Sequence, residues 1–182
     1  MFIQTEATPN PLTLKFLPGV QVMQTGTLFF TSPEAAKSSP LAQALFASNE
    51  VAAVFLSTDF ISVTKTEEAD WSTLKPMLLT AILDHFTTGK AVISDEKTSV
   101  ATIEDDSEIA AQIRELIDTR VRPAVAQDGG DIIFKSFEDG IVKLELHGAC
   151  SGCPSSTATL KQGIENMLKH YVPEVIAVEA VQ

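Results

Sequence analysis

The sequence predicts an α+β protein made of two small α+β domains joined by a linker. Two observations lead to this prediction: strand-like and helix-like hydrophobic patterns alternate along most of the chain, and the patterning weakens between about Gly89 and Asp106. A chain of 182 residues is long enough for two small domains. We therefore place one domain at residues 1–90, the linker at 91–106 and the second domain at 107–182.

The first domain is predicted to combine strands with two helices. Short alternating stretches predict its outer strands, and the continuous apolar run 51–56 predicts a buried one. Ser39-Pro40 marks a helix start, and apolar residues spaced four apart predict a longer helix. In chain order we expect strands at 2–6, 12–16 and 27–31, a helix at 39–47, strands at 51–56 and 60–65, and a helix at 71–86.

The second domain is predicted to have the order helix, strand, strand, helix, strand. Its first helix begins at Asp106 or Ser107, and Pro123 is expected to kink it or to tighten its last turn. The glycine-rich stretch 128–131 reads as a helix stop and turn. The later elements are strands at 132–137 and 141–147, a helix up to about Tyr171, and a strand at 175–181.

The charge and composition exclude several kinds of partner. The formal net charge is −11, which argues against binding to nucleic acid or to an anionic membrane surface. No stretch approaches the roughly 18 apolar residues of a membrane span, and Met1–Glu6 lacks the pattern of a signal peptide. We expect a reducing compartment: the cytoplasm of a bacterium, or the mitochondrial matrix if this is the processed form of a eukaryotic protein.

The only two cysteines, Cys150 and Cys153, fall on a short turn between a predicted strand and a predicted helix. Pro154 suits the first helical position, which puts Cys153 at the N-cap, where free N–H groups and the helix dipole lower a thiol pKa. Two thiolates at this spacing can bind one metal or one cluster edge, or can close a small disulfide ring. Because the turn is away from the apolar stripes, we expect the core to depend little on it.

The number of ligands leaves two interpretations open. A structural zinc site and a cubane cluster both usually need four protein ligands, whereas this chain offers two cysteines. Either a second chain completes the site or the pair is a redox dithiol. His147 is a candidate third ligand, but it falls on the outward, polar phase of its strand, as an ordinary histidine would.

Several segments resemble two known domains, and together they cover nearly the whole chain. The second half resembles the NifU C-terminal domain in residues 120–124, 128–131, 148–156 (Gly-Ala-Cys-Ser-Gly-Cys-Pro-Ser-Ser) and 159–165. The first half resembles the Nfu N-terminal domain in residues 8–11 (Thr-Pro-Asn-Pro), 14–16, 18–19 and 39–41.

The resemblance implies an Nfu-type iron–sulfur cluster carrier and not an enzyme. Proteins of this kind receive a 4Fe–4S cluster from an upstream assembly scaffold and deliver it to apo-enzymes. Carried over by position, Cys150 and Cys153 are the metal ligands, and the cluster is held between the two subunits of a homodimer. The scaffold and middle iron–sulfur domains of longer NifU proteins are absent, so we do not expect this chain to assemble clusters with a desulfurase.

Two alternatives follow from the residues alone. The first is a dithiol oxidoreductase, because a strand, a C-x-x-C sequence and a helix also follow one another in thioredoxin. Against it, the residue directly before Cys150 is not aromatic. Zinc takes the same thiolates, so a zinc-bridged structural dimer is the other. Analysis of iron and acid-labile sulfide under anaerobic conditions separates both from a cluster carrier.

Overall fold

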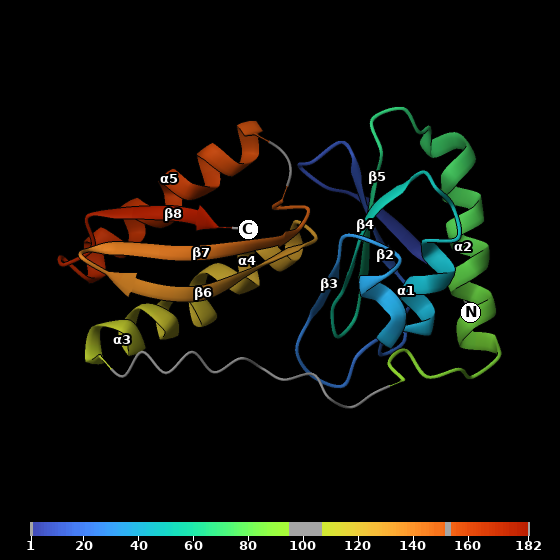
Figure 1. Ribbon diagram of the computed structural model, residues 1–182, viewed down its shortest axis with the longest axis horizontal. Helices are drawn as coiled ribbons and strands as arrows, with labels where there is room; N and C mark the ends of the chain where they lie inside the picture. Colours follow the sequence, from blue (N-terminus) through green and yellow to red (C-terminus); the bar gives the residue numbers. More distant parts are fainter. Residues whose placement is uncertain (1, 95–106, 152–153, 182) are drawn as a thin grey trace. The chain divides into compact units, whose positions relative to one another are not determined.

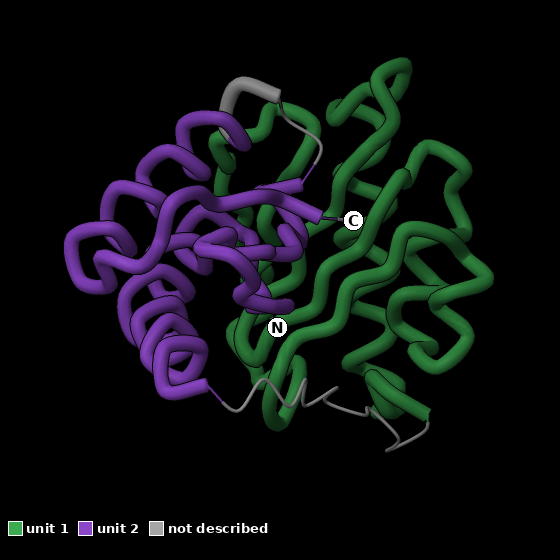
Figure 2. The backbone as a smooth tube through the Cα atoms, turned by 60° about the vertical axis from the view of Figure 1, so that its left-hand side comes forward, with its two compact units in different colours: residues 1–99 green, residues 100–182 purple. Residues whose placement is uncertain are grey.

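The computed structural model describes residues 2–94, 107–151 and 154–181, and it divides into two compact units, residues 1–99 and 100–182 (Figure 2). Each unit has its own sheet and its own apolar core, which confirms the predicted α+β class. No helix within the described ranges is long and apolar enough to cross a membrane. Residues 95–106 of the predicted linker lie outside these ranges.

The first unit is built on a five-stranded antiparallel sheet in the order β1-β2-β5-β4-β3 (Figure 1). The elements are β1 (Gln4–Ala7), β2 (Thr13–Leu17), β3 (Leu28–Phe30), the 3₁₀ turn η1 (Ala35–Ser38), α1 (Pro40–Leu45), β4 (Val51–Leu56), β5 (Ile61–Lys65) and α2 (Trp71–Thr87). All the predicted strands and helices of this half are present, with ends shifted by at most two residues; η1 was not predicted.

Both helices of the first unit pack on one face of this sheet. Phe16 and Ile61 are cross-strand partners on that face, and they share one apolar cluster with Leu41 of α1 and Leu78 of α2. Asp70 caps α2 by accepting a 2.9 Å hydrogen bond from the Ser72 N–H. Capping and burial therefore act together to fix the helices on the sheet.

The second unit has the predicted order of helix, strand, strand, helix, strand. Its elements are α3 (Glu108–Leu116), the π-helical turn η2 (Ile117–Val121), α4 (Arg122–Gln127), β6 (Gly130–Glu138), β7 (Ile141–Gly148), α5 (Pro154–Tyr171) and β8 (Ala177–Val181). The sheet order is β6-β7-β8, with β6 antiparallel and β8 parallel to the central strand β7. Ile132, Leu144 and Val178 join Ile113 and Leu168 of the helices in one core.

A kink or a tightened last turn was expected at Pro123 in the first helix of this unit. The tightened turn is wrong, because the helix widens just before the proline, and the kink stays a prediction. The Arg122 N–H donates to the carbonyl of Ile117, five residues back, and closes a π-helical turn. Pro123 has no N–H, and its ring would clash with the carbonyl four residues before it in a regular α-helix. The wider turn adds a residue before the proline and lets the helix continue as α4.

Candidate metal centre

Cys150 lies on the turn between β7, which ends at Gly148, and α5, which begins at Pro154. This placement confirms the predicted position of the turn. Ser151 Oγ donates to the Gly148 carbonyl at 2.8 Å, and Thr157 Oγ1 on the first turns of α5 donates to the Cys150 carbonyl at 3.3 Å. Cys153, the second predicted ligand, lies outside the described residues.

The thiol of Cys150 is free but buried, with only 6% of the residue exposed. It belongs to the apolar cluster of the second unit, so the expectation that the core depends little on the turn is wrong for this residue. The reason is a contact distant in sequence: the Ala149 N–H donates to the Gly129 carbonyl at 3.1 Å and draws the turn back against the start of β6.

Gly130 provides the space that the thiol fills. It pairs with Gly148 across β6 and β7. A Cβ atom at position 130 would overlap Cys150 Sγ and would lie 2.8 Å from the carbonyl oxygen of His147. Such approaches exclude any residue with a side chain unless the turn moves, so the sequence requires glycine here.

The surroundings of Cys150 favour the protonated thiol. Burial, followed by the negative charges of Asp128 and Asp131, raises the thiol pKa to about 12. The raised pKa of Cys150 does not bear on the lowered thiol pKa that was expected at Cys153, which stays a prediction.

His147 is buried, with 8% of the residue exposed, and so does not face solvent as the strand pattern suggested. Its Nε2 is hydrogen-bonded to Glu145 Oε1 at 2.7 Å, and Lys135 forms an ion pair with the same carboxylate. Burial pushes the Glu145 pKa up, but the hydrogen bonds from Lys135 and His147 outweigh it and the net pKa is lowered. The imidazole is thus held by a carboxylate, which supports an ordinary structural role.

Within the described residues, no group of three or more His, Cys, Asp or Glu side chains could hold a metal ion. Together with the cysteine count, this leaves the C-x-x-C pair as the candidate ligand set of one chain. Four-ligand sites need more than this. Two cysteines are half of such a set.

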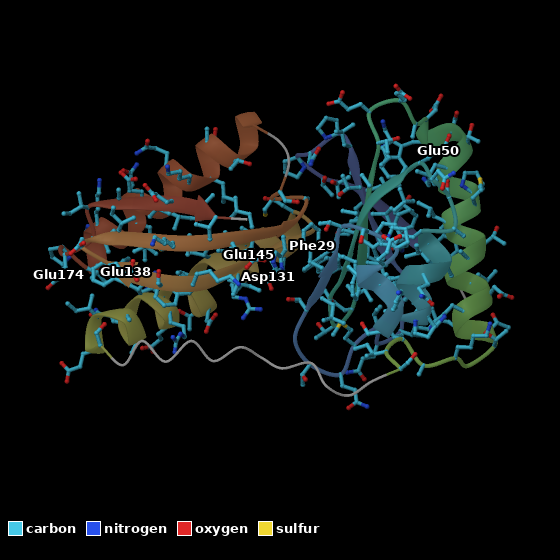
Figure 3. All side chains as sticks on the ribbon, viewed as in Figure 1. Phe29, Glu50, Asp131, Glu138, Glu145 and Glu174 are labelled. Carbon is cyan, nitrogen blue, oxygen red and sulfur yellow. The ribbon has the colours of Figure 1, made fainter. Side chains whose placement is uncertain are left out.

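Sequence reasoning gave no role to two residues beside the turn, Arg122 and Asp131. Asp131 directly follows Gly130 and is only 4% exposed, although it is a carboxylate. Figure 3 shows Asp131 and Glu145 toward one end of this unit, with Glu138 and Glu174 toward the other. Asp131 could have been singled out from the sequence because it is an acidic residue directly after the glycine pair that ends a helix.

The chain matches known families over most of its length. The family described as "Scaffold protein Nfu/NifU N terminal" matches residues 3–89, and the family described as "NifU-like domain" matches residues 113–179. The human "NFU1 iron-sulfur cluster scaffold homolog, mitochondrial" is 54% identical over 183 residues, covering 100% of this chain and 72% of that protein. The Drosophila persimilis protein of the same name is 50% identical, covering 100% of this chain and 65% of that protein.

The solution structure of a NifU-like protein from Saccharomyces cerevisiae has a TM-score of 0.48 and 26% identity, and the match covers 53% of this chain and 87% of that chain.

Proposed function

Because the chain belongs to the Nfu family, with an Nfu N-terminal domain followed by a NifU-like domain, we propose that it carries iron–sulfur clusters. It binds a 4Fe–4S cluster between two copies of itself through Cys150 and Cys153 of each copy. It receives the cluster from an upstream assembly scaffold and delivers it to apo-enzymes, without catalysing a reaction of its own. It works in the mitochondrial matrix or, in a bacterium, in the cytoplasm.

The observation that supports this proposal is the position of the C-x-x-C sequence on the turn between β7 and α5, where two cysteines could supply half of a four-ligand site. The turn joins the central strand β7 to α5, and no larger ligand group accompanies it among the described residues of the unit. Two such turns facing each other supply the four thiolates of a cubane. A cluster held this way keeps an exposed edge, from which thiolates of a recipient can replace those of the carrier one at a time.

Because the Cys150 thiol is buried and protonated, binding of a cluster must release its proton. Cys150 is protonated at neutral pH because its pKa is raised to about 12. When Cys150 becomes a ligand, its S–H bond breaks, the sulfur binds iron and the proton leaves to solvent. Cluster binding by this turn therefore strengthens as the pH rises.

The same observation disfavours the dithiol oxidoreductase. A nucleophilic cysteine needs a lowered pKa and access to its disulfide partner. Cys150 is buried, and its pKa is raised. The zinc-bridged dimer uses the same ligands as the cluster, so it is separated from the carrier by metal analysis.

The test is reconstitution of the apo-protein with ferrous iron and sulfide under anaerobic conditions, followed by native mass spectrometry. We expect a mostly monomeric apo-protein and a loaded dimer with about one cubane per two chains, because binding available only to the dimer shifts the equilibrium toward it. Adding an apo-enzyme that needs a 4Fe–4S cluster should restore that enzyme's activity and return the carrier to monomer. A loaded monomer, or a dimer that keeps its cluster before a competent recipient, would contradict the proposal.

A further inference from the structure

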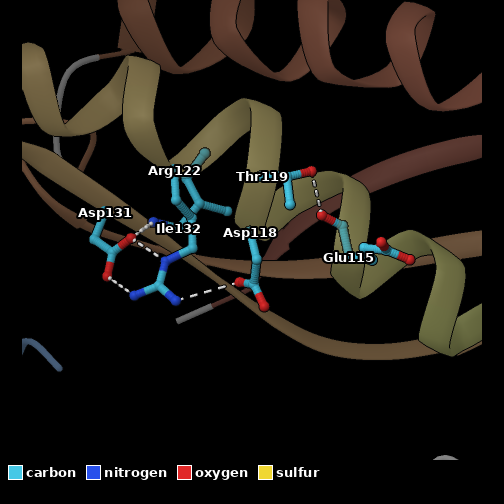
Figure 4. Close-up of polar contacts among 6 residues, drawn as sticks. All are labelled: Glu115, Asp118, Thr119, Arg122, Asp131 and Ile132. Atoms are coloured by element: carbon cyan, nitrogen blue, oxygen red, sulfur yellow. Dashed lines mark hydrogen bonds and ion pairs between the residues drawn. The ribbon is translucent and has the colours of Figure 1, made fainter. Parts of the chain in front are cut away.

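The ion pair between Arg122 and Asp131 is a two-pronged contact (Figure 4). Arg122 Nε donates to Asp131 Oδ1 and its Nη2 donates to Asp131 Oδ2, both at 2.8 Å. Asp131 Oδ1 also accepts the Ile132 N–H at 2.8 Å. A bidentate guanidinium–carboxylate contact fixes orientation as well as distance, which a single charge pair does not.

The π-helical turn brings Arg122 to this position. It ends at Val121, and Arg122 begins α4 directly before Pro123. Arg122 Nη1 also donates to Asp118 Oδ1 at 3.2 Å within that turn. The hydrogen bonds to Asp131 raise the pKa of the guanidinium further, so Arg122 stays charged. The Arg122 side chain thus links the start of α4 to the first residues of β6.

The first residues of β6 are also the ones that touch the cysteine turn. Asp131 pairs with His147 and Gly130 pairs with Gly148 across the two strands. The Gly129 carbonyl accepts the Ala149 N–H, and Gly130 contacts the Cys150 sulfur. Any shift in the backbone at 129–131 is therefore passed directly to Cys150.

We propose that Arg122 is a positioning residue for the cysteine turn: by clamping Asp131 it holds residues 129–131 in the place that seats Cys150. The inference rests on the proposed function in one respect: the reason for holding Cys150 in place is that it would bind a cluster shared by two chains. Ligands of a metal site need support of this kind, since a site held loosely loses affinity. The clamp itself is a property of the apo-protein.

The competing explanation is that the pair only stabilises the fold. The Lys143–Glu138 ion pair, 3.0 Å between Nζ and Oε2, offers a matched control. It joins the same two strands, β6 and β7, at the end away from the cysteine turn, and both of its side chains are more than a third exposed. Loss of this pair should leave the Cys150 turn unchanged.

The first experiment follows alkylation of Cys150 by iodoacetamide in the full-length apo-protein. Because the chain has two cysteines, a Cys153→Ser background makes Cys150 the single reporter. Arg122→Met, Arg122→Lys and Lys143→Met are added to this background, and rates are measured at fixed pH in several urea concentrations below the unfolding transition. Opening of a local segment is nearly independent of urea, whereas global unfolding increases steeply with it.

We expect Arg122→Met to speed alkylation by about tenfold or more, with little urea dependence, and Lys143→Met to stay within about twofold of the background. Arg122→Lys should fall between them, because a lysine cannot reproduce both bonds of the guanidinium, and it carries the test if the methionine variant does not fold. An unchanged rate would overturn the inference. So would a faster rate whose urea dependence equals that of global unfolding, since the pair would then act on stability alone.

The second experiment uses chains with both cysteines and measures how long a reconstituted cluster survives an iron chelator. We expect Arg122→Met to shorten the lifetime by about tenfold, as loss of a supporting residue does at other metal sites, and Lys143→Met to leave it unchanged. If the wild-type protein binds no cluster, the proposed function fails while the alkylation result stands. If it binds one and Arg122→Met retains it equally well, the positioning role fails.

Discussion

A side chain at Gly130 would overlap the sulfur of Cys150, so the two residues can occupy their places only while position 130 is glycine. We expect Gly130→Ala to lower the free energy of unfolding of the second unit by about 1–3 kcal/mol, as overpacking does elsewhere. The variant should also displace the thiol and reduce the amount of bound cluster. Urea unfolding and iron analysis measure the two effects.

Gly163 on α5 gives the matched control, because a Cβ atom there would meet nothing within 4 Å. Gly163→Ala should be neutral or should stabilise the unit by up to about 1 kcal/mol, since alanine favours a helix more than glycine does. If both variants behave alike, the contact between Gly130 and Cys150 is not what constrains position 130.

Cys150→Ser should remove the cluster and should also weaken the fold. The residue lies in the apolar cluster, so a buried hydroxyl there should cost about 1–3 kcal/mol. Cys150→Ala should remove the cluster with a smaller loss, because alanine introduces no polar group. Cys153→Ser should likewise reduce bound iron to background. Circular dichroism, urea titration and iron analysis of the three variants decide this, and a serine variant with a full cluster would disprove the ligand assignment.

The first unit should lose stability in mild acid because of His85 on α2. The residue is 3% exposed, and its Nε2 has no hydrogen-bond partner among the described residues. Burial lowers its pKa below the ordinary value of 6.5; Lys90 lowers it further, while Asp84 opposes the shift. Above pH 6.5 both the folded and the unfolded chain carry a neutral imidazole. Below it, the unfolded chain takes up a proton more readily, so stability falls as the pH falls, by at most about 1.4 kcal/mol per unit from this group.

Trp71, the single tryptophan, lies at the start of α2 and reports unfolding of this unit by fluorescence. Compared with the wild type, His85→Phe should show a smaller loss of stability between pH 7.5 and 5.5, within the limit of about 1.4 kcal/mol per pH unit. The exposed His170 of the second unit is the control, and His170→Gln should leave the Trp71 transition unchanged. Equal acid sensitivity in the wild type and His85→Phe would show that other groups cause it.

Limited proteolysis tests the predicted domain boundaries. We expect trypsin to cut first within 91–106, for example after Lys97, and to leave two fragments that stay folded, because each unit has its own core. Mass spectrometry locates the cut, and circular dichroism of the separated fragments checks their folding. Early cuts elsewhere, or unfolding after cleavage, would contradict a division at this place.

The local patterns of the sequence predicted most of the fold. The strand at 51–56 was predicted at its full length, because a continuous apolar run has clear ends. The last strand was predicted to start at Val175 but starts at Ala177. Val175 is buried as the pattern suggested, yet its N–H bonds to the Val172 carbonyl in a turn and not to the sheet. A buried residue in a turn and a buried residue in a strand are both apolar, so the sequence pattern does not distinguish them.

The site was less predictable because its details depend on contacts distant in sequence. The turn position of Cys150 follows from the strand and helix on either side, but its burial depends on Gly129 and Gly130. Alternation along β7 placed His147 on the polar face of the sheet. Such a pattern predicts the face on which a residue lies but not how far its side chain is buried. The clamp from Arg122 needs a π-helical turn, which no local pattern of apolar residues indicates.

Because β8 pairs with β7, the strand that leads into the cysteine turn, a ribosome must translate well past the cysteines before β7 has both of its neighbours. Val142 is paired with Val178, whose N–H also donates to Glu165 of α5 at 3.2 Å. A nascent chain that has not yet reached Ala177 already contains both thiols, but one edge of β7 is open and α5 lacks this bond. Translation thus produces the ligands before β8, which completes the sheet beside β7, and we expect a premature stop codon between Cys153 and Ala177 to yield chains whose cysteines oxidise readily.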